Sequence, residues 1–122
     1  MPTAIEFTHV IRRFGSITAV DDLTFAVPRG SITVLLGPNG AGKTSLLNCI
    51  TGYYKAQEGR IYFNGKNISN LSTHHLTRLG IGRTYQNIEL FPGMTVLSNM
   101  LLARHIHSNY GVGRASFFLR SV

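Results

Sequence analysis

The beginning of the chain alternates apolar and polar residues. Within residues 3–11, Ile5 and Phe7 are separated by one polar residue, and the alternation becomes less regular toward the end of the stretch. A period of two is typical of a strand with one buried face, so this stretch predicts a half-buried strand. A turn at Gly15 and a second apolar stretch at residues 23–27 predict a partner strand. Because the connection is short, the two strands are expected to form an antiparallel ribbon.

The apolar pattern changes in residues 31–36, where apolar side chains are nearly continuous. Such a run is typical of a strand that is covered on both faces inside a parallel α/β sheet. Residues 43–50 then have the spacing of a helix, and Gly52 is suited to end it. Cys49 in this helix is interpreted as a small buried hydrophobe. The helix residues expected to face the sheet are Leu46, Leu47 and Ile50.

The rest of the chain predicts shorter elements, which are marked by turn and capping residues. Asn64-Gly65 is a hairpin-turn signal, Ser72 and Thr95 are typical N-cap residues, and Gly80 is a typical helix end. The expected elements are a strand at 60–63, a helix from Ser72 to about Leu79, a strand at 81–85 and a helix that begins after Thr95.

A fixed motif joins the strand expected at 31–36 to the helix at 43–50. Residues 37–44, GPNGAGKT, match G-x-x-x-x-G-K-[ST] at every fixed position. Small residues let the backbone wrap around a phosphate with its N–H groups pointing inward, and the following helix adds a positive partial charge. Lys43 can reach the β- and γ-phosphates of a nucleotide, and the Thr44 hydroxyl can hold Mg²⁺. A glycine-rich turn without a ligand is the disfavoured alternative.

Composition limits the class of protein. The chain has 122 residues, of which 43% are hydrophobic and 14% are charged, which is typical of one globular domain. No apolar run approaches the ~20 residues that span a bilayer, and the N-terminus lacks the pattern of a secretory signal. A single cysteine excludes a disulfide framework. Together these features predict a cytoplasmic protein.

The chain is basic, with a formal net charge of +7. Its positive residues are scattered, and Arg12-Arg13 is the only adjacent pair. Two explanations stay open. One is a solvated basic surface that also attracts nucleotide, and the other is that an acidic part of a larger protein is missing.

Taken together, these motifs resemble the N-terminal half of an ATP-binding subunit of an ABC transporter. The resemblance runs from about residue 4 to residue 107, and within the family it is most similar to the subunits of branched-chain amino-acid importers. The general signs are GPNGAGKTS, EGRIYFNGKNI and a glutamine loop in GIGRTYQNIELFPGMTVLSN. The more specific signs are NCITGYYK and the sequence GRTYQNIELFPGMTV that leads to LLARH. The implied fold is α/β, an incomplete phosphate-loop NTPase core with an N-terminal antiparallel β subdomain.

The resemblance implies a role for each matching residue. Phe14 matches the aromatic residue that stacks on adenine, although a core aromatic at a strand end is an equally good interpretation. Thr44 would bind Mg²⁺, and Ser45 would hydrogen-bond the α-phosphate. Gln86 would contact Mg²⁺ and help to position the attacking water. The residues that would cradle the phosphates of ATP are Gly37, Pro38, Asn39, Gly40, Ala41, Gly42 and Lys43.

The family also implies partners and a location. Residues 87–96 correspond to the surface that receives a helix of a membrane subunit, where Phe91 and Met94 would suit the contact unless they are core residues. The implied partners are a second ATP-binding subunit, transmembrane permease subunits and, indirectly, a solute-binding protein, with no nucleic acid. The implied location is the cytoplasmic face of the inner (plasma) membrane, with the subunit bound peripherally.

Several parts of the family pattern are missing from these residues. After Lys43 the only acidic residues are Glu58 and Glu89, and neither follows four apolar residues. No Walker B strand is therefore found, and no LSGGQ-like signature or switch histidine occurs. We expect residues 1–122 to be the N-terminal part of one ABC nucleotide-binding domain, as a fragment or an incomplete gene product.

Two functional hypotheses follow from these observations. The first is a transport ATPase subunit that couples ATP binding and hydrolysis to the import of a solute, with branched-chain amino acids favoured. The 122 residues alone are then expected to lack full hydrolytic activity, because they offer no general base near the phosphates. The second is a truncated, catalytically inactive nucleotide-binding fragment. A GTPase is disfavoured because residues 64–67 do not supply N-K-x-D, and dispersed charge disfavours a DNA-directed ATPase.

Overall fold

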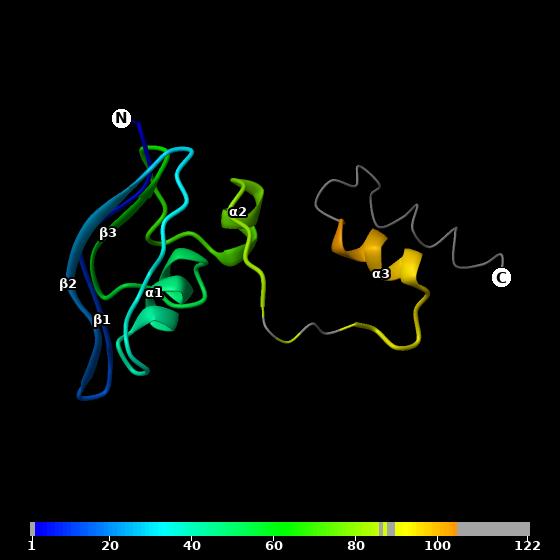
Figure 1. Ribbon diagram of the computed structural model, residues 1–122, viewed down its shortest axis with the longest axis horizontal. Helices are drawn as coiled ribbons and strands as arrows, with labels where there is room; N and C mark the ends of the chain where they lie inside the picture. The colour runs from blue at the N-terminus through cyan, green and yellow to red at the C-terminus, as the bar shows by residue number, and fades with distance from the viewer. Residues whose placement is uncertain (1, 86, 88–89, 105–122) are drawn as a thin grey trace. The chain divides into compact units, whose positions relative to one another are not determined.

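Figure 1 shows the computed structural model of the protein, which describes residues 2–85, 87 and 90–104. The chain divides into two compact units, residues 1–83 and 84–122. The first unit contains a sheet and two short helices, and the described part of the second unit contains one helix. Among the described residues, no helix has the length and apolar character that crossing a membrane requires.

The first unit is built on a four-stranded sheet with the order β2-β1-β3-β4. All of its pairings are antiparallel: β1 (Thr3–Phe14) lies between β2 (Ile17–Pro28) and β3 (Glu58–Phe63), and β4 (Lys66–Asn67) pairs with β3. The predicted ribbon is confirmed, although both of its strands extend further than the apolar pattern indicates. The predicted turn at Asn64-Gly65 is also confirmed, and both residues have positive φ, 47° and 77°.

Paired irregularities in β1 and β2 bring extra apolar side chains into the core. Phe7 and Val10 are both buried although they are three residues apart, because β1 has an extra residue between them and His9 has a positive φ of 49°. β2 has its own extra residue near Asp22, where φ is 44°, so the two strands regain their register. His9 Nδ1 lies 2.7 Å from the Asp22 carboxylate and joins the two bulges.

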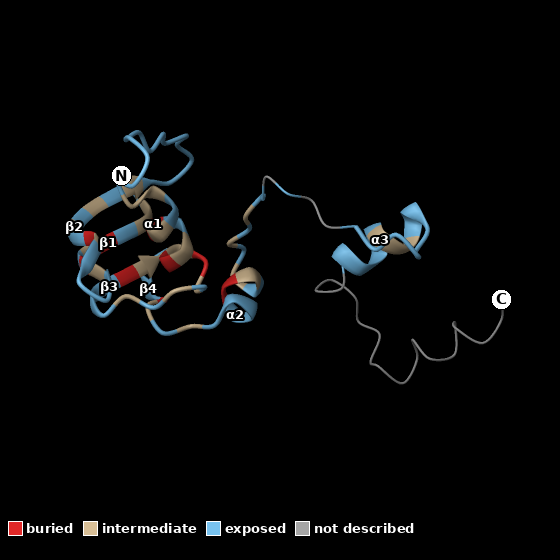
Figure 2. Ribbon diagram, turned by 90° about the horizontal axis from the view of Figure 1, so that it is seen from below, coloured by how far each residue is buried: buried red, intermediate tan, exposed pale blue. Residues whose placement is uncertain are grey.

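The core is formed jointly by the sheet, helix α1 (Lys43–Ile50) and helix α2 (Thr73–Arg78). Figure 2 shows buried residues within the first unit, whereas helix α3 (Val96–Ala103) has none. The buried apolar side chains are Phe7, Val10, Val20, Leu46, Cys49, Ile61, Ile68 and Leu76. The apolar surface that they remove from water is the main source of stability for a unit of this size.

All three predicted helices are confirmed, with their ends near the predicted residues. Gly52 follows the end of α1 at a φ of 72°, and Gly80 follows the end of α2 at a φ of 99°. Thr95 caps α3, because its side chain accepts a hydrogen bond from Ser98 N–H at 3.1 Å. Ser72 is the N-cap of α2 but makes no side-chain capping bond, and its hydroxyl contacts His75 instead.

Two of the predicted strands are wrong. Residues 31–36 and 81–85 have no regular secondary structure, and Ile32 and Leu36 are 98% and 85% exposed. A strand of a parallel sheet requires neighbouring strands to accept and donate its backbone hydrogen bonds. In the described residues every strand pairing is antiparallel and none involves these two segments. The apolar run therefore indicates that residues 31–36 are suited to burial. The described residues contain no strands that pair with this segment.

The prediction for the buried face of α1 needs a smaller correction. Leu46 is buried and Ile50 packs against the core, but Leu47 is 42% exposed. Residues 46 and 50 are four apart and share one face of a helix, whereas Leu47 is rotated away by about 100°. Cys49 is buried as predicted, and β3 begins two residues before the predicted strand.

The bulge in β1 predicts different costs for two glycine substitutions. Gly59 and Gly65 have nearly the same φ, 80° and 77°, so alanine is strained to a similar degree at both. A Cβ at Gly59 would lie 2.2 Å from the His9 carbonyl oxygen, whereas a Cβ at Gly65 meets nothing within 4 Å. We expect Gly59→Ala to lower the free energy of unfolding by about 3 kcal/mol and Gly65→Ala by about 1 kcal/mol. Urea unfolding of both variants measures the difference, and equal losses would contradict this account of the bulge.

The buried thiol of Cys49 predicts a pH dependence of stability. Burial raises the pKa of the Cys49 thiol, and the nearby Arg12 guanidinium lowers that pKa by a smaller amount. As pH rises above about 8.5 the unfolded chain releases the thiol proton while the folded chain retains it, so stability falls with pH in that window. We expect the stability difference between wild type and Cys49→Ala to become less favourable to wild type from pH 7.5 to pH 9.5 in urea titrations. A difference that is constant with pH would show that the thiol titrates alike in both states.

Candidate phosphate-binding site

Residues 37–42 form a loop that leads directly into α1, with residues 37–41 exposed and Gly42 half-buried. Gly40 and Gly42 have φ values of 85° and 89°, a region that favours glycine. The Ala41 N–H donates to the Pro38 carbonyl at 3.2 Å and closes a turn within the loop. A Cβ at Gly42 would lie 1.9 Å from the Ala19 carbonyl oxygen. The backbone of the loop therefore packs directly on β2, which only glycine permits at this position.

The N-terminus of α1 faces its loop without a capping side chain. Gly42 is the N-cap residue, and no acidic residue lies in the first turn. The first N–H groups of any helix lack acceptors within the helix, and the helix dipole makes this end attractive to an anion. In phosphate-binding loops that lead into a helix, these groups point at a bound phosphate. This end of α1 is thus suited to an anion.

Lys43 already lies over the loop. Its Nζ donates to the Gly37 carbonyl at 2.5 Å and to the Pro38 carbonyl at 2.7 Å. These bonds hold the ammonium group where the loop begins, although Lys43 is at the loop's other end. A phosphate bound in the loop could accept hydrogen bonds from the same ammonium group, so the positive charge is already close to the position that a phosphate would take.

The two hydroxyl residues that follow Lys43 lie in the first turn of α1. Thr44 is exposed and Ser45 is half-buried. Within residues 2–85, 87 and 90–104, no group of three histidine, cysteine or acidic side chains could hold a metal ion. Mg²⁺ is commonly held by one or two protein oxygens together with the phosphate oxygens of its nucleotide, so a lone Thr44 hydroxyl beside a phosphate site fits that ion.

Residues of β2, the segment 31–36, the loop and α1 line a common pocket. Asp21 is its one acidic lining residue and Lys43 its one basic residue, and the rest of the lining is apolar or backbone. The lining residues are Ala19, Val20, Asp21, Leu23, Leu35, Leu36, Ala41, Gly42, Lys43 and Leu46. The exposed segment 31–36 contributes the two leucines of this list, so part of its apolar surface faces the site.

Phe14 lies at the hairpin end of β1, and its side chain is in contact with two neighbours. The Tyr54 ring meets it edge-on with centroids 5.0 Å apart, and the Arg12 guanidinium carbon lies 4.4 Å from the Phe14 ring centroid. Phe14 is nevertheless 37% exposed, so it is not the core aromatic of the alternative interpretation. In Figure 1 the hairpin end of β1 and β2 and the loop before α1 lie toward the same end of the first unit.

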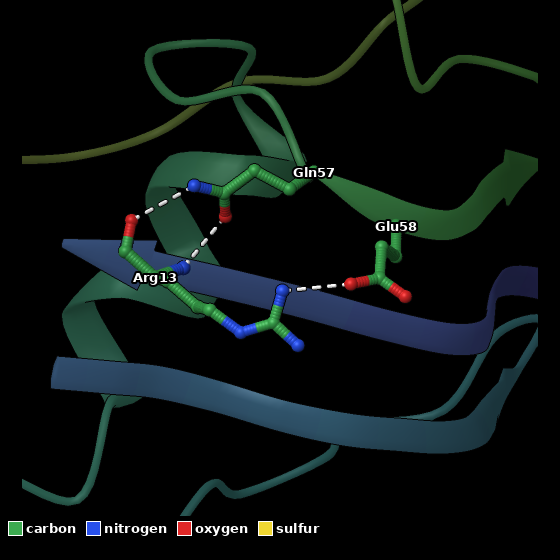
Figure 3. A network of polar contacts seen from close by, with 3 residues as sticks. All are labelled: Arg13, Gln57 and Glu58. Carbon is green, nitrogen blue, oxygen red and sulfur yellow. Dashed lines mark hydrogen bonds and ion pairs between the residues drawn. The ribbon is translucent and has the colours of Figure 1, made fainter. Parts of the chain in front are cut away.

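Sequence reasoning missed the residues that surround Phe14. The period of two places Arg12 and Phe14 on the same face of β1, and this signal could have identified Arg12 as a neighbour. No comparable signal exists for Gln57 and Glu58, which are 44 and 45 residues away from Arg13 and contact it (Figure 3). Contacts over such separations are set by the pairing of β1 with β3, which local patterns do not reveal.

The remaining predicted site residues belong to the second unit. Gln86 lies outside the described residues. Phe91 and Met94 are both exposed, so neither is a core residue in the described structure. Asn99 holds their segment, because its Oδ1 accepts from Phe91 N–H at 3.0 Å and its Nδ2 donates to the Met94 carbonyl at 3.3 Å. The segment before α3 therefore presents apolar side chains on a locally fixed backbone.

Comparison with known proteins gives the family. The model of the ABC transporter family matches residues 20–120. The branched-chain amino acid transport ATP-binding protein BraF of Pseudomonas aeruginosa is 40% identical over 105 residues, covering 86% of this chain and 41% of the relative. A probable branched-chain amino acid transport ATP-binding protein, LivG of Archaeoglobus fulgidus, is 44% identical over 99 residues, covering 81% of this chain and 38% of the relative. The chain thus spans about two fifths of the length of these curated relatives.

Solved structures agree with this assignment. A crystal structure of the ADP conformation of an ATP-binding cassette of an ABC transporter is similar with a TM-score of 0.78 and 36% identity, covering 97% of this chain and 46% of that one. A nucleotide-free ATP-binding cassette is similar with a TM-score of 0.68 and 33% identity, covering 85% of this chain and 47% of that one. The chain therefore belongs to the ABC transporter family, as part of an ATP-binding cassette with the phosphate-loop NTPase fold.

Proposed function

We propose that this chain is the nucleotide-binding part of an ABC transporter subunit that couples ATP binding and hydrolysis to solute import. The observation that carries the proposal is the Lys43 ammonium group, held on the Gly37 and Pro38 carbonyls beside an uncapped helix N-terminus. Residues 37–45 hold the phosphates of ATP, with Lys43 supplying charge. Thr44 holds Mg²⁺ together with Gln86, which also orients the attacking water. Phe14 stacks on the adenine.

The solute in this proposal is a branched-chain amino acid. Support comes from BraF and LivG, whose names state branched-chain amino acid transport and which are 40% and 44% identical to this chain. In the transporter complex the partners are a second ATP-binding subunit and transmembrane permease subunits, and a solute-binding protein acts through the permease. The location is then the cytoplasmic face of the inner membrane, with the subunit bound peripherally.

The segment before α3 supports the contact with a permease subunit. Phe91 and Met94 are exposed there, and α3 adds further exposed apolar residues, of which Val96 is one. Exposed apolar groups of this kind mark surfaces that bind another protein. Nucleic acid is not among the proposed partners, because the positive residues are scattered along the chain. The two residues of the only adjacent pair also have partners within the fold: Arg12 lies against two aromatic rings and Arg13 pairs with Glu58.

The alternative is a nucleotide-binding fragment without catalytic activity. Two of the described carboxylates make contacts outside the phosphate loop: Glu58 pairs with Arg13, and Asp22 contacts His9. Hydrolysis requires a group that fixes the metal and orients water in addition to the phosphate loop. The described residues supply the loop, and the chain spans about two fifths of its curated relatives.

Lys43→Ala is the direct test of the phosphate site. The substitution removes the ammonium group, which would donate charge-assisted hydrogen bonds to phosphate oxygens in place of the two carbonyls. We therefore expect ATP and tripolyphosphate to bind about 10- to 100-fold more weakly. Isothermal titration calorimetry with the full chain measures both affinities. Lys66→Ala is the matched control, because it removes the same charge from the exposed strand β4. Unchanged affinity in Lys43→Ala, or an equal loss in Lys66→Ala, would refute the role of Lys43.

Turnover separates the two hypotheses. We expect the 122-residue chain to bind ATP but to release phosphate no faster than its Lys43→Ala variant, because its sequence has no Walker B strand with a metal-binding aspartate and a catalytic glutamate. A coupled phosphate-release assay measures the rate. Turnover by wild type that is lost in Lys43→Ala would exclude the inactive fragment and would show that these residues complete a hydrolytic site.

A further inference from the structure

Gln57 binds the backbone of β1 at a single residue. Its side-chain Oε1 accepts from Arg13 N–H at 2.6 Å, and its Nε2 donates to the Arg13 carbonyl at 3.0 Å (Figure 3). The Gln57 backbone N–H also donates to the Ile11 carbonyl at 2.9 Å. The amide side chain thus takes the place of a strand partner for Arg13, just beyond the last pairing of β1 with β3 at Ile11 and Glu58.

This contact fixes the residue immediately before Phe14. Arg13 pairs with Thr18 of β2 on its other side, so the bonds to Gln57 place its backbone between two partners. Two backbone hydrogen bonds at one residue restrict both its φ and its ψ, and they thereby limit the direction in which the next Cα–Cβ bond points. Gln57 thereby helps to fix the backbone that carries Phe14, although its side chain bonds the preceding residue.

The same connection between α1 and β3 supports the Phe14 ring itself. Tyr54 contacts its edge, and Arg12 lies against both rings while its Nη1 donates to the Lys55 carbonyl at 2.9 Å. Arg12 Nε is buried and has no hydrogen-bond partner among the described residues, so this guanidinium is positioned by stacking and by one bond. Residues 54–57 thus support Phe14 directly or through Arg12 and Arg13, and 37% of Phe14 stays exposed.

We propose that Gln57 is a positioning residue for recognition of the nucleotide base, because it fixes the backbone that aims Phe14 at the base. The proposal rests on the function proposed above, in which Phe14 stacks on the adenine of ATP. The ligand feature recognised is a planar base, and the phosphates are recognised separately by the loop that ends at Lys43. Stacking on an aromatic ring requires a defined plane and contributes roughly 5- to 100-fold in affinity. Loss of the Gln57 contacts lets the plane of the Phe14 ring vary and removes part of the affinity gained by stacking.

The test compares two ligands that differ in the base. Calorimetry on the full chain measures binding of ATP and of inorganic tripolyphosphate, both with Mg²⁺. We expect Gln57→Ala to weaken ATP binding about fivefold and to leave tripolyphosphate binding unchanged. Gln57→Glu keeps an acceptor for Arg13 N–H but places a second carboxylate oxygen against the Arg13 carbonyl, so its loss should be at least as large as that of Gln57→Ala. Arg13→Ala is the matched control, because it removes the ion pair with Glu58 and keeps the backbone groups that Gln57 binds.

A double-mutant cycle with Phe14→Ala shows whether Gln57 acts through Phe14. We expect Gln57→Ala to cause no further loss of ATP affinity in the Phe14→Ala background. Losses that multiply in the double variant, or an equal loss for both ligands in Gln57→Ala, would overturn the positioning role. If Phe14→Ala leaves ATP affinity unchanged while binding still requires Lys43, the inference fails together with the role proposed for Phe14, and the proposed phosphate site stands. If Lys43→Ala changes neither the affinity for ATP nor the affinity for tripolyphosphate, the proposed function itself fails.

Discussion

The pairing of β1 with strands on both of its edges is the interaction on which the first unit depends. β1 joins β2 to β3, and it therefore connects residues that are far apart in the chain. Its bulge at His9 allows Phe7 and Val10 to enter the core together, and the compensating bulge at Asp22 restores the register of the hairpin. Beyond that point the strand continues into Phe14. An error in the pairing of β1 would thus disturb both the core and the aromatic residue at its end.

The phosphate loop depends on the same sheet through β2. Gly42 approaches the Ala19 carbonyl so closely that a side chain has no room, and Ala19 lies two residues beyond Ile17, the partner of Phe14. The backbone of the loop is consequently placed by β2, while its Lys43 side chain is placed by the loop's own carbonyls. This division would favour binding at the proposed phosphate site, because β2 already places part of the loop backbone. The Lys43 ammonium group and the Ala41 N–H, which donates to the Pro38 carbonyl, would exchange partners.

The sequence predictions were correct where the signal lies within a few neighbouring residues, and they failed where the structure depends on residues far apart in the chain. Gly52, Gly80, Asn64-Gly65 and Thr95 act within a few residues, and each turn or helix end was predicted correctly from it. The strand expected at 31–36 failed because a continuous apolar run reports a tendency to be buried, whereas a strand also needs partners for its backbone. Gln57 could not be found, because its contact with Arg13 spans 44 residues. The phosphate-loop motif is contained in eight consecutive residues, and its loop and helix occur where the motif requires them, whereas the strand expected before the loop does not.

Helix α1 links the two halves of the proposed nucleotide site. It begins at Lys43, where the phosphates are proposed to bind, and it ends at Ile50, from which the chain runs through residues 54–57 to the supports of Phe14. The helix is buried on one face through Leu46 and Cys49, so its two ends are held at a fixed separation by the core. The packing of one short helix thus connects the loop that begins the proposed phosphate site to the segment that supports Phe14.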